Sequence, residues 1–163
     1  MNTVATTQPK QAAYLVTHEY FHIVQNHVAN VNAPMWYLEG MAEWEAFRLV
    51  GAPIPTWLAI LLTDERQGRS HPFSTLETSE QWWQINRGAS PYFKATAAIL
   101  YLERLAGADA PIDVLRGTGV DSASFELIFS SVSGMGVEEF ENTLPQFLEE
   151  LYLEQLATQT PLP

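Results

Sequence analysis

Apolar residues recur along most of the chain at intervals of three and four, which is the spacing of one face of an α-helix. Glycine and proline residues fall between these periodic segments and separate them. Almost no segment alternates apolar and polar residues in the way a half-buried strand does. The pattern therefore predicts a mainly α protein, a helical bundle with little or no β-sheet.

Residues that begin or end helices give the expected boundaries. Gly51 ends the second helix, Thr56 is expected to be the N-cap of the third, and Ser90 followed by Pro91 begins the fourth. The aromatic segment around residues 82–83 has no clear assignment. The predicted helices cover residues 11–30, 35–50, 56–63, 90–105, 122–132 and 137–156, with Pro145 expected to kink the last one.

The first of these helices carries apolar residues around much of its circumference. It contains no glycine or proline after residue 11, and a loop ending at Pro34 follows it. A helix that is apolar on most sides is typical of the interior of a protein, so we expect a central, buried helix. The apolar residues concerned are Tyr14, Val16, Phe21, Ile23, Val24 and Val28.

Length and composition limit the kinds of function. The 163 residues, 47% of them apolar, fit one domain with a substantial core, covering residues 1–163. Because the chain has no cysteine, disulfides, thiolate metal sites and a cysteine nucleophile are excluded. The 19 acidic and 8 basic side chains give a net charge of −11, which repels a phosphate backbone. We therefore expect no nucleic-acid partner, and any metal must bind to His, Asp or Glu.

The amino-terminal residues lack the basic segment and long apolar stretch of a signal peptide. The longest apolar runs, such as residues 57–62, are too short to span a bilayer. The sequence predicts a soluble chain without a membrane span. Its compartment and oligomeric state stay open.

The segment His18-Glu19-Tyr20-Phe21-His22 matches H-E-x-x-H inside a predicted helix, the context in which this motif binds zinc. A spacing of four residues places both imidazoles on one face of the helix. Their nitrogens can then share one metal ion at about 2.0 to 2.1 Å, while Glu19 lies close to the position left for water. The motif predicts two ligands and a general base.

The next predicted helix supplies carboxylates. The segment W-Y-L-E-G-M-A-E covers residues 36–43 and places Glu39 in the first turns of that helix. An antiparallel pair of helices would bring Glu39 back beside the histidines. Glu43 lies one turn further on the same face and can accept the second N–H of a ligand histidine. The two segments together offer three ligands, a base and a group that orients a ligand.

H-E-Y-F-H-I-V-Q at residues 18–25, followed by W-Y-L-E-G-M-A-E-W at residues 36–44, resembles the gluzincin metallopeptidases. The likeness is greatest to the bacterial peptidase-MA-like proteins and more distant to the thermolysin and aminopeptidase N families. It implies that His18, His22 and Glu39 bind Zn²⁺ and that Glu19 is the general base. A weaker likeness continues through residues 90–95 and 101–107 into the helical tail.

The resemblance also implies an activity. We expect a zinc-dependent hydrolase that cleaves peptide bonds with metal-activated water, acting on a peptide or protein substrate. In several gluzincins a tyrosine donates a hydrogen bond to the developing oxyanion, and Tyr92 is the candidate for that role here. A buried aromatic residue with a satisfied hydroxyl is the alternative for Tyr92.

One departure from the family concerns the sheet that binds substrate. Gluzincins place a β-sheet before the active-site helix, and its edge strand pairs with the extended peptide. Only 17 residues precede His18 in this chain. We expect either the carboxy-terminal part of a longer enzyme or a metal site on a reduced, helical scaffold. A catalytically inactive helical module that binds metal or a partner is the alternative function.

Overall fold

The computed structural model describes residues 7–29, 32–51, 54–85, 90–119 and 124–159. These residues are mostly helical and none of them lies in a β-strand, which confirms the mainly α bundle for the described part of the chain. Within the described ranges, no helix has the length and apolar character needed to cross a membrane. The elements are α1 (Thr7–Val28), α2 (Met35–Val50), α3 (Ile54–Arg66), the short 3-10 helix η2 (Phe73–Thr75), α4 (Ser79–Ile85), α5 (Ser90–Ala106), α6 (Ala110–Thr118), α7 (Phe125–Ser133) and α8 (Val137–Gln159).

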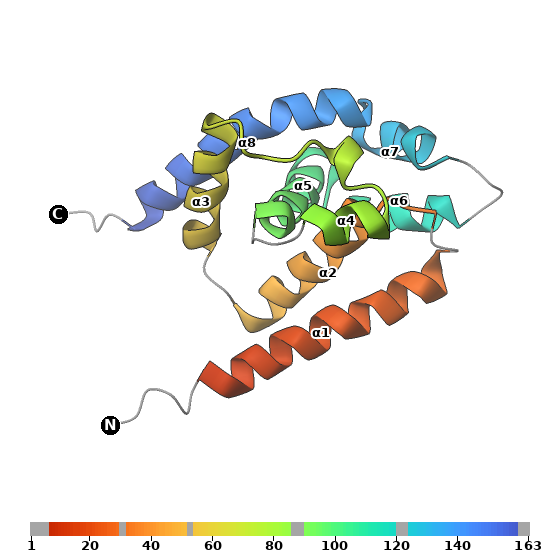
Figure 1. Ribbon diagram of the computed structural model, residues 1–163, viewed down its shortest axis with the longest axis horizontal. Helices are drawn as coiled ribbons and strands as arrows, with labels where there is room; N and C mark the ends of the chain where they lie inside the picture. Colours follow the sequence, from red (N-terminus) through yellow and green to blue (C-terminus); the bar gives the residue numbers. More distant parts are fainter. Residues whose placement is uncertain (1–6, 30–31, 52–53, 86–89, 120–123, 160–163) are drawn as a thin grey trace.

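Helix α2 lies inside the bundle, between α1 and α5 (Figure 1). It packs against α1 on one side and α5 on another, and these are the two most extensive contacts between helices. Residues 36–44 are all buried, including the carboxylates of Glu39 and Glu43. A helix covered on all sides places its polar side chains in the interior, where they need partners.

Helix α1 lies along the edge of the bundle (Figure 1). Its inner face packs on α2, whereas Val16, Tyr20 and Ile23 are 68%, 63% and 64% exposed. The prediction of a central first helix was therefore wrong. Apolar residues around a helix do not show how many neighbours cover it, and in the described structure only one side of α1 is covered.

Helices α1 and α2 run antiparallel, as expected. The Tyr14 ring, near the start of α1, lies 5.5 Å from the ring of Phe47, near the end of α2. Gln25, near the end of α1, donates a hydrogen bond from Nε2 to the carbonyl of Leu38, near the start of α2. Residues later in α1 therefore contact residues earlier in α2. The middle of α1 lies opposite the first turns of α2.

Several helix ends differ from the prediction. Helices α2 and α5 have nearly the predicted extents, and glycines with positive φ, Gly51 at 61° and Gly107 at 101°, follow them. Helix α3 begins at Ile54, so Thr56 lies inside it and is not its N-cap. Pro55 is tolerated there because the first turn of a helix does not need its N–H. Residues 30, 122 and 123, at predicted ends, lie outside the described residues, as does the Ser90 side chain.

Two helices were not predicted. Helix α6 is short and has Pro111 in its first turn, and the Tyr37 hydroxyl donates to the Pro111 carbonyl at 2.8 Å, which ties α6 to α2. The unassigned aromatic segment forms α4, in which Trp82 is buried and Trp83 is 64% exposed. Pro145 lies inside α8, and the kink expected there stays a prediction.

The closest approach of α2 to α5 is at Gly40. A methyl group on this residue would lie 2.5 Å from the carbonyl oxygen of Ala95 and 3.1 Å from a side-chain carbon of Ile99. Carbon atoms do not approach a backbone oxygen this closely without displacing it. Glycine is therefore required at the position next to Glu39 for α2 and α5 to pack as they do.

Replacing Gly40 with Ala should lower the free energy of unfolding by about 1 to 3 kcal/mol, because the added methyl group forces α2 and α5 apart. In an exposed helix the same replacement of glycine with alanine has the opposite effect and raises stability by up to about 1 kcal/mol. Urea denaturation followed by circular dichroism measures the change. Gly136→Ala is the control, because a methyl group there meets nothing within 4 Å. Equal stability of the Gly40→Ala variant and the original chain would contradict the close contact.

Candidate metal centre

The three predicted ligands meet where α1 faces the first turns of α2. His18 Nε2 lies 3.1 Å from His22 Nε2 and 3.4 Å from Glu39 Oε2, and His22 Nε2 lies 3.7 Å from Glu39 Oε1. One ligand atom from each residue can be chosen so that all three lie within 4.8 Å of one another. The fold thus brings His18, His22 and Glu39 together, as the sequence predicted.

The size and burial of this cluster fit a metal ion. Ligands at 2.0 to 2.1 Å from a tetrahedral zinc lie about 3.3 Å apart, and the observed separations are close to that value. His18 is 9% exposed and Glu39 is 5% exposed. One oxygen of Glu39 and the Nδ1 atom of His18 are buried without a hydrogen-bond partner. A bound cation would offset the cost of burying this carboxylate.

Glu19 lies next to His18 on an exposed part of α1. A helix turns 100° per residue, so its side chain leaves the helix beside the two histidines without sharing their direction. It is not one of the residues whose ligand atoms converge. The role of Glu19 as general base stays a prediction.

Tyr92 lies in the first turn of α5, half-buried between the cluster and α4. Its ring centroid is 6.4 Å from that of His18 and 4.9 Å from that of the buried Trp82. The fold therefore brings Tyr92 to the edge of the candidate metal centre, as its predicted role requires. Hydrogen bonding to an oxyanion stays a prediction.

Glu43 is buried one turn beyond Glu39, and one of its carboxylate oxygens has no hydrogen-bond partner. Among the hydrogen bonds of the described residues, none joins Glu43 to His18 or His22. Burial raises the pKa of Glu43 to about 7. Glu43 is buried as one turn beyond Glu39 would suggest, but it makes no hydrogen bond to a ligand histidine among the described residues, and its orienting role stays a prediction.

Gln25 contacts the candidate ligand His22, and this contact was not predicted from the sequence. Its Oε1 atom lies 2.8 Å from His22 Nδ1, and the residue is only 2% exposed. A spacing of three residues on one helix face was the available signal, because such residues are neighbours on an α-helix. The orienting group for His22 thus comes from α1 itself.

No family model, curated protein or solved structure matches this chain. The likeness to gluzincins therefore depends on the motifs at residues 18–25 and 36–44. The assignment of ligands depends on the distances and burial given above.

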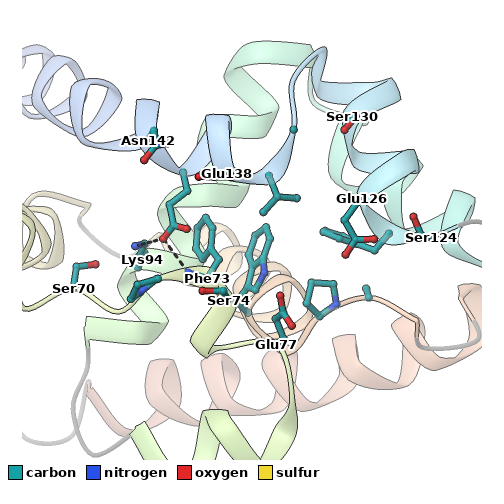
Figure 2. Close-up of a pocket in the computed structure, with 18 of the residues that line it drawn as sticks. Ser70, Phe73, Ser74, Glu77, Lys94, Ser124, Glu126, Ser130, Glu138 and Asn142 are labelled. Atoms are coloured by element: carbon teal, nitrogen blue, oxygen red, sulfur yellow. Dashed lines mark hydrogen bonds and ion pairs between the residues drawn. The ribbon is translucent and has the colours of Figure 1, made fainter.

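A separate pocket of about 1300 Å³ lies beside η2, α7 and α8 (Figure 2). None of the three converging ligands lines it. Its lining combines the aromatic side chains of Trp36, Phe73 and Phe125 with carboxylates. This pocket is distinct from the candidate metal centre.

The charged groups at one side of this pocket satisfy one another. Lys94 Nζ donates to Glu141 Oε1 at 2.6 Å, an interaction drawn as a dashed line at Lys94 in Figure 2. It also donates to the His71 carbonyl at 2.9 Å. Glu141 Oε1 also accepts from the Phe73 backbone N–H at 2.9 Å. Lys94 was not predicted as a notable residue, although a cation within the apolar part of a helix indicates a buried partner of opposite charge. These bonds give Lys94 a structural role.

Substituting Glu43 with Gln should change how the stability of the metal-free protein depends on pH. Burial raises the pKa of this carboxyl in the folded state to about 7 from 4.5. The protonated form therefore stabilises the fold below pH 4.5, and this contribution is lost as the pH rises to 7 and above. Relative to the original chain, Glu43→Gln should be about equally stable at low pH and more stable by about 1 to 3 kcal/mol at high pH.

Urea denaturation in the presence of a chelator, repeated across this pH range, measures the difference. Glu45→Gln is the control, because Glu45 lies on the same helix, is only partly buried and pairs with Arg48. If the difference in stability between the Glu43→Gln variant and the original chain does not vary with pH, the raised pKa of Glu43 is contradicted.

Proposed function

We propose that this chain is a zinc-dependent hydrolase of the gluzincin type that cleaves peptide bonds. The observation that carries the proposal is the convergence of His18, His22 and Glu39 within 3.1 to 3.7 Å, with Glu19 between the two histidines in sequence. The likeness of the two ligand-bearing segments to gluzincins supports a peptide or protein as the substrate.

Each candidate residue has a separate role in the proposed hydrolysis. When bound, zinc lowers the pKa of a coordinated water toward about 7 and polarises a carbonyl group. His18, His22 and Glu39 hold the ion through atoms that two packed helices keep in place. Glu19 accepts the proton of the water and then delivers it to the leaving amine. Tyr92, at the edge of the cluster, donates a hydrogen bond to the oxyanion.

A specific observation favours a second candidate function, a catalytically inactive module that binds metal or a partner. None of the described residues forms a strand that could pair with an extended peptide. The outer face of α1 exposes Val16, Tyr20 and Ile23, a surface suited to contact with another protein. Metal binding and peptide cleavage, measured separately, distinguish the two functions.

The metal-free chain should bind about one zinc ion, because its converging ligand set has three members. His22→Ala should abolish this binding, and Glu39→Gln should weaken it by at least about tenfold, because each removes or neutralises a ligand. Competition with a chromophoric chelator gives the affinity, and elemental analysis gives the stoichiometry. His27→Ala is the matched control, since this exposed histidine lies on the opposite side of α1 from His18. Failure of the original chain to take up zinc would refute the metal site.

Glu19→Gln separates catalysis from metal binding. The substitution keeps the shape of the side chain and removes the base, so zinc should remain bound while peptide cleavage slows by about 100-fold or more. Mass spectrometry of a mixed peptide library, with and without chelator, measures cleavage. The same substitution at the exposed Glu126 is the control. Equal rates for Glu19→Gln and the original chain would contradict the mechanism, and zinc binding without any cleavage would favour the inactive module.

A further inference from the structure

We propose that Gln25 is a positioning residue that fixes the tautomer of His22, so that the Nε2 lone pair of this histidine faces the metal. The inference rests on the proposed metal site. It concerns a side chain that belongs to neither the ligand set nor the catalytic groups.

The Gln25 amide lies between two polar groups in the interior. Its Nε2 atom donates to the Leu38 carbonyl at 2.7 Å, and its Oε1 atom lies 2.8 Å from His22 Nδ1. With the residue only 2% exposed, water cannot readily replace either bond. The amide nitrogen of Gln25 therefore has the Leu38 carbonyl as its acceptor, and the amide oxygen has His22 Nδ1 as its partner.

The Leu38 carbonyl determines which way the amide points. A backbone carbonyl can only accept a hydrogen bond, so the NH₂ group of Gln25 must face Leu38 and the amide oxygen must face His22. An amide oxygen also only accepts, so His22 Nδ1 must carry the hydrogen. In a neutral imidazole the other nitrogen then has a free lone pair.

That other nitrogen is the one in the cluster. His22 Nε2 lies 3.1 Å from His18 Nε2 and 3.7 Å from Glu39 Oε1. Without metal, a neutral His22 with its hydrogen on Nδ1 can only accept in the contact with His18, so His18 is the donor. His22 is therefore held in the protonation pattern that a metal ligand needs, before any metal arrives.

The same amide also sets the register of the two helices that carry the ligands. Leu38 immediately precedes Glu39, so the bond from Gln25 fixes the α2 backbone next to the third ligand. His18 has no equivalent support, because its Nδ1 atom is buried without a hydrogen-bond partner. Gln25 thus positions one ligand ring directly and the segment before Glu39 through the backbone.

Two substitutions separate these effects. Gln25→Leu removes both hydrogen bonds, whereas Gln25→Glu keeps an acceptor toward His22 and loses the donor toward Leu38. Asn26→Leu is the matched control, because it removes an amide from the adjacent, exposed position of α1. The tautomer of His22 is read from imidazole ¹⁵N chemical shifts of the metal-free protein, at a pH where the histidines are neutral. Zinc affinity is measured in parallel.

The original chain, Gln25→Glu and Asn26→Leu should all carry the hydrogen of His22 on Nδ1. Gln25→Leu should shift His22 toward the tautomer with hydrogen on Nε2 and weaken zinc binding by about 10- to 100-fold. A purely structural role for Gln25 would not move the tautomer in a folded variant.

The inference is overturned if His22 carries its hydrogen on Nε2 in the original chain, or if folded Gln25→Leu keeps the Nδ1 tautomer. If Gln25→Leu does not fold, the Gln25→Glu variant provides the test. Retention of the Nδ1 tautomer of His22 in that variant supports the inference, and loss of this tautomer overturns it. The tautomer is measured without metal or substrate. A chain with the Nδ1 tautomer that binds no zinc would therefore refute the proposed function, while the control of the His22 tautomer by Gln25 would still stand.

Discussion

The complete burial of residues 36–44, the first part of α2, determines where the candidate functional side chains can lie. Because this part of α2 lies between α1 and α5, the Glu39 and Glu43 side chains lie in the interior, whereas Arg48, further along the helix, reaches solvent. Gly40 allows this packing, since any side chain at that position would meet the backbone of α5. The position of Glu39 opposite the histidines is thus a consequence of how closely three helices approach one another.

Two buried charged residues, Lys94 and Glu39, differ in whether the chain supplies hydrogen-bond partners for them. Lys94 is satisfied by the chain itself, through Glu141 and the carbonyl of His71. Glu39, in contrast, keeps one buried oxygen without a hydrogen-bond partner, beside two imidazoles whose charge depends on protonation. Desolvation makes an unmatched carboxylate costly, and a cation shared with the two histidines is the simplest way to offset that cost. Glu43 and Glu65 each also bury one carboxylate oxygen without a hydrogen-bond partner, and Glu39 differs from them in converging with two histidines.

The surroundings of the cluster support its ligands unequally. His22 is held by Gln25, which is itself fixed by a backbone carbonyl, whereas His18 packs against Tyr92 and leaves Nδ1 unpartnered. Glu43 adds a buried carboxyl with a raised pKa near Glu39. In the proposed metal centre, one ligand histidine would therefore be oriented by a hydrogen bond and the other would not.

The helical class, the approximate extents of α2 and α5, and the identity of the three converging residues could all be predicted from the amino-acid sequence. Helical period, terminal glycines and the H-E-x-x-H spacing are local properties, so they can be read without knowing the neighbours. The packing of the helices was needed to show that α2 and not α1 is buried, that α6 exists, and that Gln25 contacts His22. These features depend on which surfaces cover one another, and a pattern along the chain does not specify how many neighbours a helix has or which buried atom lacks a partner.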